Sequence, residues 1–219
     1  MERKLSTNQR AVIFANGEIK DDQAVVTMLS QHDSLIAADG GLNHMVRMGL
    51  TPNVLIGDLD SASPEAILSL EAASVPILRY PVDKNETDLE LAIAHAISEG
   101  HRRIVIVGAL GGRFDQALGN LFLLSADTLA GLDIRLDDGR EEVCLIRSYH
   151  EIEGRAGDTV SLIPLGSPVT GILTQNLRYP LNHETLYPDH TRGISNVLLG
   201  DSASVRIESG LLVCIHTRG

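Results

Sequence analysis

The fold class follows from IVIVGALGGRFDQ, residues 104–116, which joins an apolar run to a glycine-rich turn and then to the expected start of a helix. A run that is apolar at every position is typical of a strand buried on both faces of a parallel sheet. Glycines let backbone N–H groups approach a phosphate, and a helix N-terminus favours an anion. This stretch therefore predicts a strand–turn–helix unit with a candidate phosphate-binding turn. An ordinary strand-to-helix turn stays open as the alternative.

The same alternation extends outward over the first part of the chain. The other apolar runs are Ala11–Ala15, Leu35–Ala38, Val54–Ile56 and Ile77–Tyr80. Helical spacing is found at Asp22–Gln31, Leu42–Met48, Pro64–Ala73, Thr87–Glu99 and from Phe114 to about Leu129. Alternating strands and helices predict a doubly wound, mainly parallel sheet, and we assign this α/β domain to residues 1–130.

After Gly131 the pattern changes to short apolar runs separated by Gly and Pro, with no long helix. The runs are Ile134–Leu136, Val143–Ile146, Val160–Ile163, Gly171–Leu173, Val197–Leu199, Ala203–Ile207 and Leu211–Ile215. Many short strands without helices are typical of a small antiparallel β-sandwich or barrel. We assign such a second domain to residues 131–219.

Composition excludes several function classes. A formal net charge of −11 argues against nucleic acid and anionic membranes as partners, because their phosphates attract basic surfaces. No run approaches the roughly 20 apolar residues of a membrane span, and the start of the sequence is polar. The only cysteines, Cys144 and Cys214, are expected to be reduced. A cytoplasmic location is therefore expected.

Two carboxylates follow the run Val54–Ile56 in the segment Gly57–Ser61. Residues two apart on an extended chain point the same way, so Asp58 and Asp60 are expected to project together. At about 4 Å and an effective dielectric of about 20 they repel by about 4 kcal/mol. A hard cation such as Mg²⁺ relieves that repulsion. The alternative is that Asp60 and Ser61 cap the next helix.

Two further segments carry charged groups before a helix. In DKNETD, residues 83–88, the spacing of Thr87 and Glu90 predicts a capping box, which explains Thr87 and Asp88 without a ligand. It does not explain Asp83 and Lys84. In the glycine-rich turn, Arg113 stands where the helix dipole disfavours a cation, and a bound anion would remove that conflict.

Taken in order, these motifs resemble the thiamine pyrophosphokinase family. They are ADGG at 38–41, PNVLIGDLDS at 52–61, DKNETD at 83–88 and GGRFDQ at 111–116. LRYPL at 177–181 and GISN at 193–196 are also similar to that family. The resemblance implies an α/β nucleotide domain followed by a β-sandwich that binds thiamine and dimerises. It also implies a homodimer whose active site lies at the subunit interface.

The resemblance also implies roles for individual residues. Asp58, Asp60 and Asp88 are the expected metal ligands, and with Arg113 they are the expected catalytic residues. The expected ATP-binding residues are Asp39, Asp83, Lys84, Thr87, Gly111, Gly112, Arg113, Asp115 and Gln116. The expected thiamine-binding residues are Tyr179, Ser195 and Asn196. The chain departs from the family where Asn85 replaces a usual acid, and it has no Trp to stack on thiamine.

The expected reaction is transfer of diphosphate from ATP to the hydroxyl of thiamine, with Mg²⁺ as cofactor and AMP as the second product. One alternative is a pyrophosphokinase for another alcohol, such as a hydroxymethyl pterin. A second alternative is a module that senses ATP without catalysis.

Overall fold

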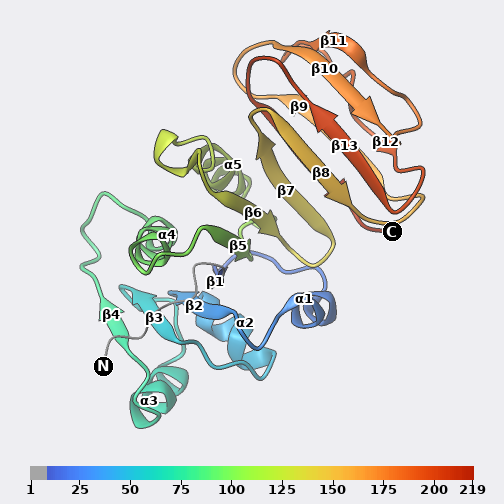
Figure 1. The fold of residues 1–219 in the computed structure, drawn as a ribbon. Helices are drawn as coiled ribbons and strands as arrows, with labels where there is room; N and C mark the ends of the chain where they lie inside the picture. Colours follow the sequence, from blue (N-terminus) through green and yellow to red (C-terminus); the bar gives the residue numbers. More distant parts are fainter. Residues whose placement is uncertain (1–8) are drawn as a thin grey trace. The chain divides into compact units, whose positions relative to one another are not determined.

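The computed structural model describes residues 9–219 (Figure 1). The chain forms two compact units, of which the first extends to Gly139 and the second covers Arg140–Gly219. The division falls later in the chain than the boundary expected between residues 130 and 131. The reason is that the run at Ile134–Leu136 forms a strand of the first unit, where it pairs in parallel with its neighbour.

The first unit alternates strands and helices, as expected. Its elements in chain order are β1 (Arg10–Phe14), α1 (Asp22–Met28), β2 (Ser34–Ala38), α2 (Gly41–Arg47), β3 (Val54–Gly57), α3 (Pro64–Ala72), β4 (Ile77–Arg79), α4 (Asp88–Ser98), β5 (Arg103–Val107), α5 (Phe114–Leu123), a 3₁₀ turn (Asp127–Leu129) and β6 (Asp133–Asp137). The helix expected to reach Leu129 thus ends at Leu123, and the 3₁₀ turn follows it.

These strands form a parallel sheet in the order β6-β5-β1-β2-β3-β4. The chain winds from β1 to one edge at β4, crosses back through α4 to β5, and then continues to β6. The strand order therefore reverses between β1 and β5. In open α/β sheets a ligand binds at the carboxyl ends of the strands beside such a reversal. The predicted doubly wound fold is confirmed.

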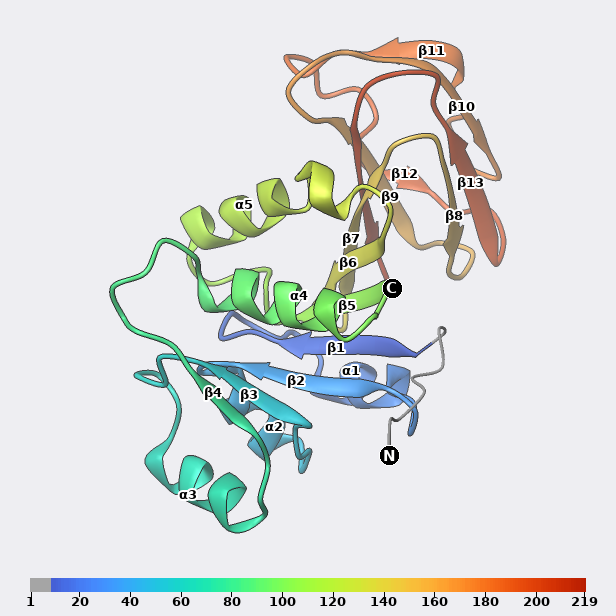
Figure 2. The same cartoon turned by 60° about the vertical axis from the view of Figure 1, so that its left-hand side comes forward.

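Helices cover both faces of this sheet. Figure 2 shows α4 on the face opposite α1, α2 and α3. Both α2 and α4 contact the central strands β1 and β2. The core between the layers contains the fully buried side chains of Phe14, Leu42, Met45 and Leu55. Burial of a side chain of this size stabilises the fold by about 1.5–3 kcal/mol, so the sheet holds the loops at its carboxyl edge firmly.

The second unit is built from antiparallel strands. They are β7 (Glu141–Ile146), β8 (Tyr149–Glu153), β9 (Thr159–Pro164), β10 (Val169–Gln175), β11 (Asn182–Leu186), β12 (Asn196–Val197), β13 (Ser202–Arg206) and β14 (Leu212–Thr217). One layer has the order β12-β9-β14-β7 and the other β11-β10-β13-β8. Buried residues of both layers, including Leu162 and Leu212 from one and Ile172 and Val205 from the other, form a single core. The predicted β-sandwich is confirmed.

Among residues 9–219, no helix combines the length and the apolar character that crossing a membrane requires.

Candidate functional site

A cavity of about 630 Å³ opens at the carboxyl edge of the first unit, where the strand order reverses. The loops after β1 and β5 meet there: Gly17 N donates a hydrogen bond of 2.7 Å to Gly108 O. A Cβ on Gly17 would lie 2.4 Å from that oxygen, so the contact requires glycine. The lining residues include Asn16, Gly17, Asp39, Thr87, Asp88, Gly108, Gly111, Asp115, Gln116 and Asn120. The N-termini of α4 and α5 lie at this edge, and their free backbone N–H groups favour an anion such as a polyphosphate.

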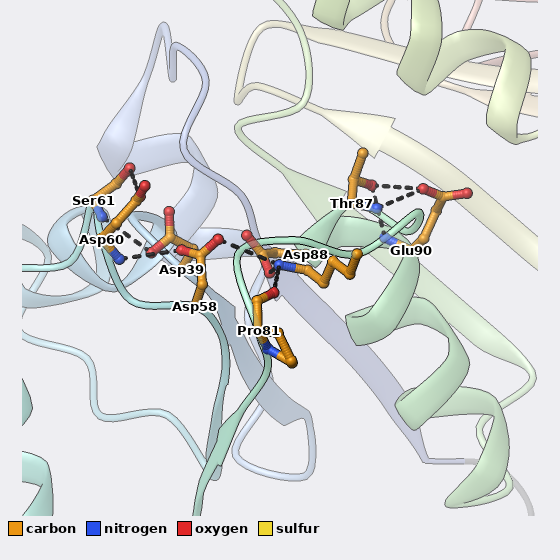
Figure 3. Close-up of polar contacts among 9 residues, drawn as sticks. Asp39, Asp58, Asp60, Ser61, Pro81, Thr87, Asp88 and Glu90 are labelled. Atoms are coloured by element: carbon orange, nitrogen blue, oxygen red, sulfur yellow. Dashed lines mark hydrogen bonds and ion pairs between the residues drawn. The ribbon is translucent and has the colours of Figure 1, made fainter.

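Three carboxylates from different elements gather beside this cavity (Figure 3). Asp39 follows β2, Asp58 follows β3, and Asp88 is the first residue of α4. One oxygen of each lies within 4.8 Å of the others. Asp39 and Asp88 line the cavity itself. Three oxygen ligands that converge in this way match the coordination that a hard divalent cation prefers.

The surroundings of Asp58 and Asp88 shift their pKa values in opposite directions. The backbone N–H of Asp60 donates to Asp58 and, together with the Lys84 ammonium, lowers the pKa of Asp58. Burial raises the pKa of Asp88, and the negative charges of Asp58 and Asp39 add to that effect, although Lys84 opposes it. Asp88 Oδ1 is buried and lacks a well-formed hydrogen bond. The Lys84 ammonium, 3.0 Å from this oxygen, offsets part of its lost solvation, and a metal ion could do the same.

Lys84 lies against the same carboxylates. Its Nζ is 3.3 Å from Asp58 Oδ2 and 3.0 Å from Asp88 Oδ1, and it donates to Pro81 O at 3.1 Å. Only 11% of the lysine side chain is exposed. Burial works against the ammonium, but the hydrogen bonds and charges of Asp88 and Asp58 outweigh it and raise the pKa of Lys84. The lysine is therefore charged and held in the cluster.

The backbone after β3 differs from the extended chain expected there. Leu59, between the two expected ligands, has a φ of 68°, so Asp58 and Asp60 do not project as neighbours on a strand. Asp60 is exposed and its Oδ1 accepts a hydrogen bond of 2.8 Å from Ser61 Oγ. Asp39, expected only as an ATP contact, takes the third place in the cluster. The assumption of an extended backbone was wrong because the strand ends at Gly57.

Residues of the glycine-rich turn divide into two groups. Gly111, Asp115 and Gln116 line the cavity. Arg113 is the N-cap residue of α5, and its exposed guanidinium pairs with Asp115 at 2.6 Å. This ion pair lowers the pKa of Asp115. It also neutralises the Arg113 charge at the helix N-terminus, so no bound anion is needed for that purpose. Neither Arg113 nor Gly112 is among the lining residues.

The loop before α4 combines a structural and a ligand-facing role. The predicted capping box is present: Glu90 N donates to Thr87 Oγ1 at 3.2 Å, and Thr87 N donates to Glu90 Oε2 at 2.8 Å (Figure 3). Thr87 and Asp88 nevertheless line the cavity. Asp83 is exposed and stands outside both the cluster and the lining.

In the second unit, the structure brings Tyr179 and Asn196 together. Tyr179 N donates to Asn196 Oδ1 at 3.0 Å, and Asn196 Nδ2 donates to Tyr179 O at 2.8 Å. Val197 N also donates to Asn196 Oδ1, at 2.9 Å. Asn196 is buried, whereas the Tyr179 side chain is exposed. Ser195 is exposed and its N–H donates to Ser161 Oγ at 3.1 Å.

Several residues around the cavity were not expected from the sequence. Asn120 lines it and donates to Ala109 O at 3.0 Å, which fixes the loop after β5. His44 of α2 contacts Gly17 O through Nε2 at 2.7 Å, while its Nδ1 makes no hydrogen bond with any described residue. Burial lowers the pKa of His44. Asn120 and His44 could have been predicted only from the strand order, because it brings the loop after β1 beside the loop after β5.

Two family models match the chain. "Thiamin pyrophosphokinase, catalytic domain" matches residues 25–136, and "Thiamin pyrophosphokinase, vitamin B1 binding domain" matches residues 146–212. Thiamine pyrophosphokinase of Bacillus subtilis (strain 168) is 28% identical over 189 residues, which cover 85% of this chain and 88% of that protein.

Other relatives and solved structures agree with these matches. Thiamine pyrophosphokinase 1 of Oryza sativa subsp. japonica is 27% identical over 84% of this chain and 78% of that protein. The crystal structure of thiamine pyrophosphokinase from Bacillus subtilis has a TM-score of 0.84 at 25% identity, and covers 96% of this chain and 99% of that one. The chain belongs to the thiamine pyrophosphokinase family.

Proposed function

We propose that this chain transfers the diphosphate group of ATP to the hydroxyl of thiamine, which gives thiamine diphosphate and AMP. The observation that carries the proposal is the match to a catalytic and a vitamin B1 binding domain of one family, in that order along the chain. The cavity at the reversal of the sheet, with three carboxylates beside it, supports the same reaction. The chain is a thiamine diphosphokinase.

The donor set fits Mg²⁺. Asp39, Asp58 and Asp88 offer three converging carboxylate oxygens, and the buried Asp88 Oδ1 lacks a well-formed hydrogen bond. Hard cations prefer such oxygens. We assign these three residues as metal ligands and keep the exposed Asp60 as a fourth candidate. When bound, the ion would neutralise charge on the phosphate oxygens.

The residues around the cavity would bind and orient ATP. Backbone N–H groups at Gly111 and Gly112, with Thr87, Asp115 and Gln116, are the proposed contacts for the nucleotide. Lys84 and Asp83 are assigned to the same task, and Arg113 is assigned to stabilise charge on the transferred group. Arg113 would have to leave its pair with Asp115 to do so.

In the reaction the thiamine hydroxyl oxygen forms a bond to the β-phosphorus. The bond from that phosphorus to the oxygen shared with the α-phosphate breaks, and AMP leaves with the electron pair. A carboxylate of the cluster would accept the hydroxyl proton.

We assign thiamine to Tyr179 and Ser195 and give Asn196 the task of holding the Tyr179 backbone. We further propose a homodimer in the cytoplasm, with ATP and thiamine bound by different subunits. One face of α5 supports an assembly, because Phe114, Leu118 and Phe122 are spaced four residues apart and are 80%, 40% and 50% exposed. Exposed apolar stripes of this kind are typical of protein interfaces.

Nucleotide stoichiometry tests the reaction. With ATP, Mg²⁺ and thiamine, we expect one AMP for each thiamine diphosphate and no ADP, measured by chromatography after limited turnover. Without thiamine, AMP formation should nearly stop because no aligned nucleophile replaces the alcohol. ADP with thiamine monophosphate would indicate a simple kinase. Turnover only with a hydroxymethyl pterin, or none from folded protein, would favour the two alternatives.

A further inference from the structure

Lys84 lies against two of the three carboxylates that a metal ion would bind. Its ammonium touches Asp58 Oδ2 and Asp88 Oδ1, which are two of the three converging carboxylates. The third contact, to Pro81 O, anchors the ammonium from the loop that carries it. Asp39 belongs to the cluster but has no ion pair with Lys84 among the described contacts. The lysine therefore neutralises one side of the cluster and leaves the other open.

A divalent cation that binds Asp58 Oδ2 and Asp88 Oδ1 would compete with this ammonium for the same two oxygens. Mg²⁺ binds carboxylate oxygens at about 2.0–2.1 Å, whereas the ammonium stands 3.0 Å from Asp88 Oδ1. An ion bound to Asp58 and Asp88 would lie against Lys84, and two cations in contact repel. Lysine can move away because its charge sits on a flexible four-carbon stem.

We propose that Lys84 is an internal counter-ion that competes with the metal for Asp58 and Asp88 until a triphosphate draws it away. The inference rests on the proposed function in one respect, that the ligands are a divalent cation and ATP. Free metal then binds weakly, because it must displace the lysine. Triphosphate supplies the lysine with a new anionic partner and opens the carboxylates to the ion. Metal and nucleotide consequently bind with positive coupling, and each strengthens the other by the same factor.

The test is metal binding without turnover. Lys84→Met keeps the length of the side chain and removes the charge. Mn²⁺ is titrated into nucleotide-free protein, and binding is measured by calorimetry and by the electron paramagnetic resonance of free Mn²⁺. The Mn²⁺ affinity of Lys84→Met should be at least about tenfold higher than that of the unaltered chain. Lys84→Arg should restore weak binding because it keeps the charge.

Two controls locate the effect. Lys20→Met removes a lysine that pairs with Asp138 at 3.2 Å, outside the cluster, and should leave Mn²⁺ affinity unchanged. Adding Asp58→Asn to Lys84→Met should abolish the gain, because the ion would lose one of its carboxylates. A non-hydrolysable ATP analogue should raise Mn²⁺ affinity several-fold in the unaltered chain and less in Lys84→Met.

Equal or weaker Mn²⁺ binding by folded Lys84→Met overturns the inference, because the lysine would then be neutral or helpful to the metal. If that variant does not fold, Lys84→Gln is measured by the same criterion. The result is separable from the proposed reaction. Tight Mn²⁺ binding by Lys84→Met in a chain that forms no thiamine diphosphate would support the counter-ion and refute the reaction.

Discussion

Asn196 holds the backbone of Tyr179 through both of its own polar groups. The amide oxygen of Asn196 accepts from Tyr179 N at 3.0 Å, and the amide nitrogen donates to Tyr179 O at 2.8 Å. These bonds link the loop after β10 to the start of β12, across the intervening segment 176–195 that contains the edge strand β11. The side chain of Asn196, a residue expected to face thiamine, is thus engaged with the backbone of Tyr179.

Replacement of Asn196 by Ala should lower the free energy of unfolding by about 1–3 kcal/mol, because the hydrogen bonds of its buried amide to Tyr179 and Val197 are lost. It should also raise the KM for thiamine far more than the KM for ATP. Urea unfolding and steady-state kinetics check both. Ser195→Ala is the matched neighbour, and it should change the KM for thiamine with little change in stability. Unaltered stability of Asn196→Ala would contradict the clamp.

Gly57 leaves no space for a side chain beside the acidic cluster. A Cβ at this position would lie 3.0 Å from Asp39 Cβ and 3.1 Å from Asp88 Cγ, and its φ of 148° is unfavourable for other residues. Gly57→Ala should therefore displace two of the carboxylates. If strain of about 1–3 kcal/mol falls on the site, kcat/KM decreases by about fivefold to 150-fold.

Metal affinity and thermal unfolding should accompany that kinetic measurement. Gly200→Ala is the control, because no atom lies within 4 Å of a Cβ built there. It should leave activity and stability near their original values. A Gly57→Ala chain with normal metal affinity and normal turnover would show that the three carboxylates do not act together.

Much of the first unit was predictable because strands buried on both faces appear as uninterrupted apolar runs. The runs at Val54–Ile56 and Ile104–Val107 became β3 and β5 within a residue. β8 and β11 were missed for the same reason. Their sequences, YHEIE and NHETL, are mostly polar and have half-buried or exposed positions, so an apolar-run criterion does not detect them.

The site was predictable only where it depends on neighbours in sequence. The capping box of Thr87 and Glu90 needs four consecutive residues and is present. The acidic cluster forms because β2 and β3 are neighbours in the sheet and because α4 begins beside their carboxyl ends. No local sequence pattern encodes that arrangement. Asp58 and Asp60 were expected to project together because an extended backbone was assumed through Leu59, whose positive φ the sequence did not reveal.

His44 should make stability depend on pH in a defined direction. Its pKa is lowered from 6.5, first by burial and also by the nearby Arg47. The unfolded chain therefore binds the proton more readily than the folded one, and the free energy of unfolding falls as pH decreases below about 6.5. A glutamine at this position can still donate to Gly17 O but does not titrate. As the pH falls, the free energy of unfolding should therefore decrease less for His44→Gln than for the original chain.

Urea unfolding of both proteins at pH 7.5 and pH 5.5 measures this difference. Relative to the original chain, the free energy of unfolding of His44→Gln should be higher at pH 5.5 than at pH 7.5. His32→Gln, at an exposed histidine, is the control and should follow the original chain. Parallel pH profiles for His44→Gln and the original chain would rule out a titrating role for His44.

A shared active site can be tested by complementation between two inactive chains. Arg113 belongs to the first unit and Tyr179 and Ser195 to the second. If ATP and thiamine are bound by different subunits, a mixed dimer of Arg113→Ala with a Tyr179→Ala/Ser195→Ala chain contains one site without any substitution. Random mixing makes half of the dimers mixed, so about a quarter of the original activity should return. Differently tagged chains purified through both tags verify the mixed dimers. If verified mixed dimers of the two inactive chains stay inactive, each site is built within one chain. In that case every site of the mixed dimer carries one set of substitutions, because its ATP-binding and thiamine-binding residues come from the same chain.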